Sequence, residues 1–248
     1  MSREMGRTEE LREGMSKYEW YHVIDLGHGV VTPGQYDLRS QLAPYGFPSS
    51  LAGKTVLDVG PGHGYFAFEF EKRGAARVAT TELPSWVGHD ASPALQAWHE
   101  AHETVAANVE YHRGAFGFAI EALGSRVERL FCSVYDIGPE TTGVFDLVFC
   151  GSLLLHLTDP LRALYGIRRA TREVAVVATG IDPVDVPESR ALFYGTQYGQ
   201  AFWMPNMTCL EQMALAAGFS RVERVSTFDL KSVDGKFDTP HGVIRAYP

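Results

Sequence analysis

The chain of 248 residues has 22 basic and 30 acidic side chains, a formal charge of −8, and a hydrophobic content of 45%. This composition fits one large globular domain, and the acidic balance disfavours nucleic-acid partners, which usually require a basic stripe. No apolar run approaches the roughly 20 residues of a membrane helix, and the charged N-terminus lacks an apolar signal core, so we expect a cytoplasmic protein without membrane contact.

Cysteine and histidine spacing gives no sign of a metal site or a disulfide framework. Cys132, Cys150 and Cys209 are odd in number and never form a CxxC pair. His99 and His102 have the i, i+3 spacing of a helix, which fits an exposed helix face better than a ligand pair. We therefore expect no bound metal.

The N-terminal region combines a helix with a loop. Residues 8–18 are predicted to form a short helix with Thr8 as its cap. Residues 20–37 have the sequence WYHVIDLGHGVVTPGQYD, which is rich in glycine and aromatic residues. A disordered segment would not carry so many bulky side chains, so we expect an ordered loop here.

From residue 54 onward, apolar runs of strand length alternate with helical patterns. The predicted strands are 54–60, 77–83, 129–134, 144–150 and 173–179. The predicted helices between them are 64–74, 92–105, 115–124 and 160–171. Strands that are apolar on both faces and separated by helices predict a parallel, doubly wound sheet.

The C-terminal part has a different pattern. A helix is predicted over 208–219, opened by a capping box of Thr208 and Glu211 and closed by a glycine. Two strand-like runs follow, at 221–228 and 242–248, and they are close enough to pair as a hairpin.

These elements predict an α/β fold with a doubly wound, mostly parallel, seven-stranded Rossmann-like sheet that ends in an antiparallel C-terminal hairpin. We expect residues 1–50 to form the N-terminal helix and a cap loop over the active site. Residues 51–248 would form the Rossmann-like domain.

A glycine-rich turn follows the first strand, in the sequence VLDVGPGHG. Ligands of open α/β sheets bind at the carboxyl ends of the strands, so this turn is expected to lie under a nucleotide. Its glycines, Gly60, Gly62 and Gly64, lack the third glycine position of the dinucleotide fingerprint, and the lysine of a P-loop is missing. An NAD(P) oxidoreductase is therefore disfavoured as an alternative.

An acid at the end of the second strand supports a nucleoside ligand. Glu82 lies 22 residues after Gly60 and is placed to accept hydrogen bonds from both ribose hydroxyls. The structural alternative is a tight turn beside an ordinary surface acid. The combination of the glycine turn, Glu82 and their spacing favours the ligand site.

The stretch from Asp58 to Gly64, Asp-Val-Gly-Pro-Gly-His-Gly, resembles motif I of class I S-adenosylmethionine-dependent methyltransferases. From about residue 18 to residue 230, the chain is similar to the branch that includes the tRNA wobble-uridine carboxymethyltransferase and natural-product methyltransferases. The segments that carry this similarity are 20–37, 82–86, 134–161 and 201–219. The resemblance implies S-adenosylmethionine as the cofactor, S-adenosylhomocysteine (SAH) as its product, and no metal.

The resemblance also implies residue roles. An acid after the third strand would lie near the adenine amino group, which implies Asp136, although Asp136 could equally cap a turn. The backbone after the fourth strand would line the sulfonium. The cofactor residues implied in this way are Asp58, Gly60, Gly62, Gly64, Glu82, Leu83, Tyr135, Asp136, Cys150 and Gly151.

Two segments can cover the carboxyl edge of the sheet, the N-terminal loop and residues 181–206. They hold enough aromatic surface to sandwich a planar or apolar acceptor, although aromatics at this density could equally pack the cap on the core. The residues that we expect to bind the acceptor are His28, Tyr36, Tyr194, Tyr198 and Trp203.

Two histidines are candidates for a catalytic base, because imidazole titrates near neutral pH. His156 closely follows the fourth strand and is the first candidate, and His22 is the second. Either could instead bond a backbone carbonyl and orient a loop.

The departures from the carboxymethyl enzyme favour a plain methyl donor. The resemblance implies that a tyrosine and an arginine of that enzyme contact the extra carboxylate of its cofactor. The corresponding residues here are Leu155 and approximately Gly199, which offer no charge-assisted partner. We therefore expect a methyltransferase acting on O, N or C of a small molecule in specialised metabolism.

Two alternative functions stay open at this point. The chain could be a tRNA-modifying enzyme of the same branch, or a cofactor-binding protein without methyl transfer. Assembly as a homo-oligomer is compatible with each of these functions.

Overall fold

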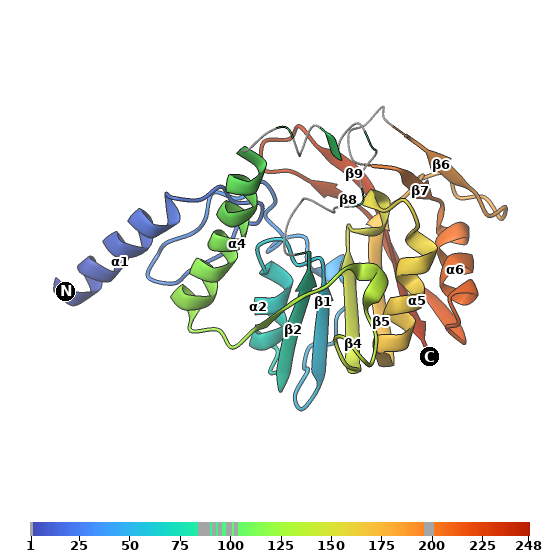
Figure 1. The fold of residues 1–248 in the computed structure, drawn as a ribbon, viewed down its shortest axis with the longest axis horizontal. Helices are drawn as coiled ribbons and strands as arrows, with labels where there is room; N and C mark the ends of the chain where they lie inside the picture. Colours follow the sequence, from blue (N-terminus) through green and yellow to red (C-terminus); the bar gives the residue numbers. More distant parts are fainter. Residues whose placement is uncertain are drawn as a thin grey trace.

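The computed structural model in Figure 1 describes residues 2–83, 90, 93, 96, 97, 101, 104–195 and 201–248. Its main sheet has seven strands in the order β3-β2-β1-β4-β5-β9-β8. The strands are β1 (Thr55–Val59), β2 (Arg77–Glu82), β3 (Glu128–Phe131), β4 (Phe145–Gly151), β5 (Thr171–Gly180), β8 (Arg221–Lys231) and β9 (Asp238–Tyr247). Strands β1 to β5 are parallel, and β9 runs antiparallel to both β5 and β8. The predicted fold class is confirmed, including the C-terminal hairpin.

Helices cover both faces of this sheet. The helices are α1 (Ser2–Met15), α2 (Tyr65–Lys72), α4 (Thr104–Leu123), α5 (Pro160–Ala170) and α6 (Met207–Ala216). One hydrophobic core lies between the sheet and α2, α4 and the N-terminal segment, and the other lies between the sheet and α5 and α6. In Figure 1, α1 extends away from the sheet at the left. Within the described residues, no helix has the length and apolar character needed to cross a bilayer.

Consecutive residues of a strand contribute to different cores. In β4, Phe149 belongs to the core with α2, and Val148 belongs to the core with α5. Neighbouring side chains of a strand point to opposite faces, and both faces are covered here, so both sets of side chains are mostly apolar. This is why residues 147–150 form a continuous apolar run rather than an alternating one, after the buried acid Asp146.

The strand register places several turns along one edge of the sheet. Val59 of β1 pairs with Thr81 of β2 and with Cys150 of β4, so the three strands end at nearly the same level. Gly151 pairs in turn with Ala178 of β5. The segments that follow these strands therefore meet at the carboxyl edge, where open α/β sheets bind ligands.

The predicted N-terminal helix and its cap are wrong in detail. The helix spans Ser2–Met15 rather than residues 8–18, and Thr8 lies inside it. The Thr8 hydroxyl donates to the carbonyl of His28 at 3.3 Å instead of capping the helix. Arg3, Glu4, Met5 and Arg7 are good helix formers, so the helix extends over them without needing a cap at residue 8.

The predicted helix over 115–124 is the second half of α4, which begins at Thr104. Gly114 falls in the middle of this helix, where a Cβ would lie 2.6 Å from the ring of Tyr18. This glycine therefore permits a close approach of the N-terminal segment rather than a break in the helix. Much of the predicted helix over 92–105 lies outside the described residues.

The predicted capping box of α6 is also wrong. Asn206 is the N-cap, and its side chain accepts a hydrogen bond from the amide of Cys209 at 2.9 Å. The hydroxyl of Thr208 donates to the carbonyl of Val186 at 3.0 Å, and Glu211 pairs with Arg224 at 2.8 Å. The helix begins at Met207, so Thr208 already lies within its first turn and its side chain is used by a tertiary contact.

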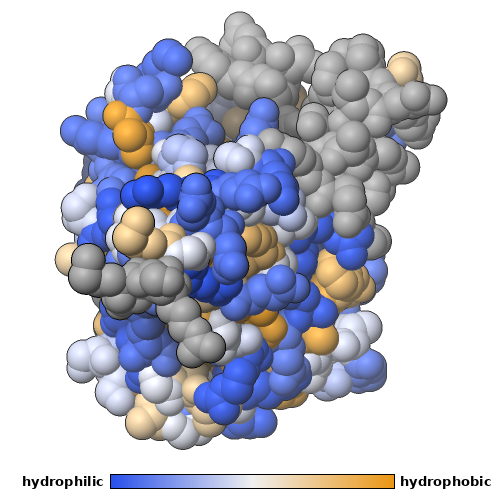
Figure 2. All heavy atoms as spheres, turned by 90° about the vertical axis from the view of Figure 1, so that its left-hand side faces the viewer, coloured by the Kyte–Doolittle hydropathy of each residue, from blue (hydrophilic) through white to orange (hydrophobic). Residues whose placement is uncertain are grey.

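A space-filling view from the side of α1 shows mostly hydrophilic side chains, with apolar residues in small separate groups (Figure 2). Isolated apolar residues of this kind are normal on a protein surface. In this view, the face beside α1 shows no broad apolar surface on the residues that are coloured.

Candidate active site at the carboxyl edge of the sheet

The glycine turn between β1 and α2 depends on glycine for two reasons. Gly62 has φ +55° and Gly64 has φ +84°, a region that other residues adopt only with strain. A Cβ on Gly64 would also lie 2.1 Å from the ring of Phe116, and one on Gly62 would lie 3.1 Å from the ring of His22. The turn is therefore held close to α4 on one side and to the N-terminal loop on the other.

Asp58 lies at the base of this turn with an unused hydrogen-bond acceptor. The side chain is buried, and its Oδ2 has no hydrogen-bond partner among the described residues. Burial raises the pKa of Asp58 to about 8, and the amide of Ala67 opposes this shift without cancelling it. A buried carboxylate with a free acceptor atom is suited to a cationic hydrogen-bond donor, because such a donor offsets its desolvation.

Glu82 ends β2 and is already paired on one side. Its Oε1 accepts hydrogen bonds from Nε of Arg129 at 3.1 Å and from Nη2 at 2.6 Å. Both side chains are mostly buried. Leu83 follows directly and is half-buried. The carboxylate at this strand end therefore has a fixed position. Both hydrogen bonds from the guanidinium go to Oε1, and neither goes to Oε2.

Tyr135 lies in the short 3-10 turn η2 (Val134–Asp136), which follows β3. Its hydroxyl donates to the carboxylate of Asp90, which also accepts from the Thr158 hydroxyl at 2.7 Å. Burial and this hydrogen bond raise the pKa of Tyr135 to about 12. Ser133 is the cap of this turn, so Asp136 does not cap it. The side chain of Asp136 is exposed.

The end of β4 is close to β9. Cys150 is fully buried, and burial raises the pKa of its thiol. After Gly151, the backbone enters the left-handed region at Ser152, with φ +51°. The Ser152 hydroxyl lies 2.9 Å from Nε2 of His241, whose Nδ1 lies 2.9 Å from the carbonyl of Thr239. A carbonyl can only accept, so Nδ1 carries the proton and Nε2 accepts from Ser152.

The two histidines expected as bases have different surroundings. His156 is half-buried in the 3-10 turn η3 (Leu154–His156). The pKa of His241 is lowered by burial, and the nearby His156 lowers it further. His22 is buried, its Nδ1 has no partner among the described residues, and burial lowers its pKa to about 3. His22 is therefore neutral at physiological pH and a weak proton acceptor.

The structure separates the residues expected to bind the acceptor. His22 and Tyr36 lie side by side in a β-bridge, and the Tyr36 ring lies 5.0 Å from the Tyr21 ring. His28 is exposed at the tip of the same loop, where its carbonyl accepts from Thr8 of α1. Tyr36 thus belongs to the part of the loop that meets the glycine turn, and His28 does not.

The second aromatic segment forms a small antiparallel pair of strands, β6 (Ala191–Phe193) and β7 (Trp203–Pro205). The Trp203 ring lies 4.7 Å from the ring of Phe193, and its Nε1 donates to the Thr158 carbonyl at 3.3 Å. Tyr194 is half-buried, and its amide donates to the Phe202 carbonyl at 2.9 Å. Tyr198 and Gly199 lie outside the described residues.

The apolar side chains around Trp203 line a cavity of about 250 Å³ with Leu154 and Met213. Leu155 is almost completely buried in the adjacent turn, and its carbonyl accepts from the amide of Phe202 at 2.7 Å. This contact attaches the β6–β7 pair to the turn that carries His156.

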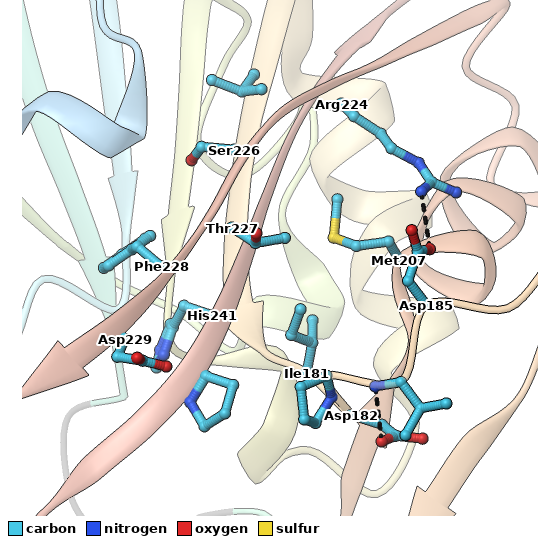
Figure 3. A pocket seen from close by; sticks show the side chains of 14 residues that line it. Ile181, Asp182, Asp185, Met207, Arg224, Ser226, Thr227, Phe228, Asp229 and His241 are labelled. Carbon is cyan, nitrogen blue, oxygen red and sulfur yellow. Dashed lines mark hydrogen bonds and ion pairs between the residues drawn. The ribbon is translucent and has the colours of Figure 1, made fainter.

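A larger cavity of about 460 Å³ lies beside β8 and β9 (Figure 3). His241 and Asp229 lie together at one end of it, and Arg224 pairs with Asp185 at 3.2 Å at another.

Ser152 and His241 were not expected as site residues, and no local pattern points to them, because they are 89 residues apart. In the part of the chain that the structure describes, no three His, Cys, Asp or Glu side chains are grouped to hold a metal. His99 and His102 lie outside the described residues.

Comparisons with known proteins bear on the family and the fold. A family model described as a methyltransferase domain matches residues 34–224. The tRNA U34 carboxymethyltransferase of Pseudomonas putida is 27% identical over 200 residues, covering 75% of this chain and 51% of the relative. That of Shewanella denitrificans is 29% identical over 184 residues, covering 71% and 47%. The chain thus spans about half the length of these curated relatives.

Two solved structures have the same fold. The N-terminal domain of EvdMO1, solved with SAH bound, has a TM-score of 0.60 at 15% identity and covers 97% of this chain and 96% of that chain. An S-adenosylmethionine-dependent methyltransferase from Mesorhizobium loti has a TM-score of 0.52 at 13% identity and covers 84% and 96%. At these identities, the likeness shows the fold alone.

Proposed function

The chain belongs to the methyltransferase domain family, and from this premise we propose that it binds S-adenosylmethionine at the glycine turn and methylates a small-molecule acceptor. The observation that carries this proposal is the meeting of Gly62, Asp58 and Glu82 at one edge of the sheet. A backbone without side chains, a buried acceptor atom and a second carboxylate at the next strand end fit a ligand that carries an ammonium and two vicinal hydroxyls.

The cofactor residues divide by chemistry. Oδ2 of Asp58 would accept from the ammonium of the methionyl part, because this atom is buried without a partner among the described residues. Glu82 would accept from the ribose hydroxyls. Leu83, Tyr135 and Asp136 would contact the adenine, and the backbone at Cys150 and Gly151 would line the sulfonium.

The cofactor supplies a methyl group that is already activated by its sulfonium. The protein must align the acceptor, exclude water, and take up a proton where the nucleophile carries one. His156 is our first candidate for that proton, because it is half-buried in the turn that follows β4 and lies close to His241. His22 would serve as a neutral hydrogen-bonding group, since its pKa of about 3 makes it a poor base.

A small acceptor is supported by the surfaces around this edge. Tyr36 and Trp203 belong to two separate aromatic groups. The formal charge of −8 does not favour the phosphate backbone of a nucleic acid.

A tRNA acceptor is the second candidate, favoured by the names of the curated relatives. Leu155 stands against a carboxylated donor, because it is a buried aliphatic side chain and offers no charge-assisted hydrogen bond. This observation concerns the methyl donor and not the acceptor. The second candidate is therefore an enzyme that transfers a plain methyl group to tRNA.

The proposal is tested by calorimetry with S-adenosylmethionine and SAH, followed by transfer of labelled methyl to small-molecule extracts and to total tRNA. We expect micromolar binding of both cofactor forms and label in the small-molecule fraction. Label in tRNA would replace the acceptor part of the proposal. The absence of any binding at millimolar cofactor would overturn the whole proposal.

A further inference from the structure

Arg129 stands behind Glu82 at the end of β2, and we infer that it is a positioning residue for the cofactor: it holds the Glu82 carboxylate so that one oxygen stays available for both ribose hydroxyls. The inference rests on the proposed function, because it assumes a ligand with a ribose at this strand end. It adds a residue on β3 that no sequence motif singled out.

The number of hydrogen-bond sites supports this role. A carboxylate offers about four acceptor sites, two on each oxygen. Arg129 uses both sites of Oε1, through Nε at 3.1 Å and Nη2 at 2.6 Å. The two sites of Oε2 match the two neighbouring hydroxyls of a ribose. A freely rotating Glu82 would present the same atoms only part of the time, so fixing it lowers the entropic cost of binding.

Arg129 is itself held from several sides. Its Nη1 donates to the carbonyl of Arg113 in α4 at 3.0 Å. Its guanidinium lies over the ring of Phe116 at 4.8 Å and over that of Phe131 at 5.5 Å. The side chains of Arg129 and Glu82 are only 16% and 19% exposed, so solvent screens this pair less than a surface pair. A planar guanidinium suits such a site, and the point charge of a lysine does not.

The same aromatic contact connects Arg129 to the glycine turn. Phe116 packs under the guanidinium, and its ring also occupies the place where Gly64 would carry a Cβ, at 2.1 Å. One side chain of α4 therefore supports both the turn at the end of β1 and the acid at the end of β2. Arg129 and Phe116 together set the spacing of the two parts of the cofactor site.

A second arginine–glutamate pair joins the same two strands and provides a matched control. Arg77 of β2 bonds Glu128 of β3 at 2.6 Å, near the opposite end of the sheet. This pair is much more exposed, at 38% and 49%, and lies far from the turn along the strands. The control pair has the same chemistry and joins the same two strands, but it does not lie at the carboxyl edge of the sheet.

The test uses calorimetry on the full chain, with SAH and its 2′-deoxy counterpart as probes. Arg129→Met keeps an unbranched apolar stem while it removes the guanidinium and every donor. We expect it to weaken SAH binding at least tenfold and 2′-deoxy-SAH binding far less, so that the preference for the intact ribose shrinks. Arg77→Met should bind both probes as the wild type does, within about twofold.

Two further variants keep the test decisive. Arg129→Lys retains the charge but cannot supply two parallel N–H groups to one oxygen, so it should lose the same ribose preference even if Arg129→Met fails to fold. In a Glu82→Ala background, Arg129→Met should cause no further loss of SAH affinity, because the arginine acts through that carboxylate.

The outcomes separate the inference from the function on which it rests. If the Arg129 variants keep the ribose preference of the wild type, or lose both probes equally, Arg129 is not a positioning residue. If Glu82→Ala loses the preference while Arg129→Lys and Arg129→Met do not, the inference alone fails. If the wild-type chain binds neither S-adenosylmethionine nor SAH, the proposed function fails first.

Discussion

The hydroxyl of Ser152, at the end of β4, lies 2.9 Å from Nε2 of His241 on β9. Ser152 holds this position with a backbone φ of +51°, and His241 is almost completely buried. A serine with positive φ is strained, and strain of this kind persists where the surroundings stabilise it, often near functional sites. Here the stabilising contact is a hydrogen bond to a buried imidazole.

This contact predicts the effects of two substitutions at the same position. Ser152→Ala keeps the strained backbone and leaves Nε2 of His241 without a partner, so we expect a loss of about 1–3 kcal/mol in unfolding free energy. Ser152→Gly loses the same bond but relieves the strain, so it should be more stable than the alanine variant by about 1 kcal/mol. Urea unfolding of both variants measures the difference. An alanine variant as stable as the glycine variant would contradict the strain at Ser152.

The glycine turn predicts two different kinds of defect. Gly62→Val should abolish SAH binding and cost less stability than Gly64→Val, because its Cβ would lie 3.1 Å from the His22 ring and 3.4 Å from the Tyr21 ring, in addition to the strain at φ +55°. Gly64→Val should instead destabilise the fold, because its Cβ would lie 2.1 Å from the Phe116 ring in the core between sheet and helices. Calorimetry with SAH and thermal unfolding of both variants test this contrast. Unchanged SAH affinity in Gly62→Val would mean that the cofactor does not lie on this turn.

The raised pKa of Asp58 predicts a pH-dependent stability. Its folded value of about 8 lies above the unfolded value, so the native state binds the proton more tightly, and stability falls as pH rises from about 4 to about 8. Asp58→Asn removes this titration and should be more stable than the wild type at pH 8, with the difference shrinking toward pH 4. Urea unfolding across this range measures both slopes. Parallel slopes in the two proteins would show that Asp58 titrates normally.

The same group predicts a proton release on cofactor binding. An ammonium beside Asp58 would favour its charged form, so SAH should bind more tightly at pH 8 than at pH 6 in the wild type. Asp58→Asn should bind SAH more weakly and without this pH dependence. Calorimetry in two buffers of different ionisation enthalpy counts the protons directly. No proton release by the wild type near pH 7 would argue against an ammonium at Asp58.

The lowered pKa of His22 predicts a loss of stability in acid. The folded value of about 3 lies below the unfolded value, so the unfolded state binds more protons between about pH 6.5 and pH 3. Stability should therefore fall with decreasing pH, by up to about 1.4 kcal/mol per pH unit from this group. His22→Gln should reduce this acid sensitivity, and His28→Gln, in the same loop but exposed, should not. Equal acid slopes in His22→Gln and His28→Gln would contradict the burial of a neutral His22.

Much of the sheet, and the position of the candidate cofactor site on it, can be predicted from the amino-acid sequence. Strands β1 and β4 are mostly apolar because both of their faces are covered, with Asp58 and Asp146 as buried exceptions, and this pattern is a local property of the chain. The turn at Gly60 to Gly64 follows β1 directly and Glu82 ends β2, and parallel strands bring their carboxyl ends to one edge. Local pattern and topology were sufficient for both.

The helix caps show where local pattern is insufficient. Thr8 and Thr208 both have the residue type of an N-cap, yet each hydroxyl donates to a distant backbone carbonyl. Asn206 caps α6 instead, because tertiary packing decides where the helix begins. A side chain that can bond locally or across the fold follows the packing around it.

The pairings of the candidate site residues, and the burial that shifts their pKa values, depend on tertiary structure. Ser152 and His241 are 89 residues apart, and Glu82 and Arg129 are 47 residues apart, so no spacing in the sequence connects them. The pKa of Asp58 and that of His22 move in opposite directions for one reason, since burial penalises the charged form of each. Burial is a property of the assembled fold, and it emerges only when distant segments close over a residue.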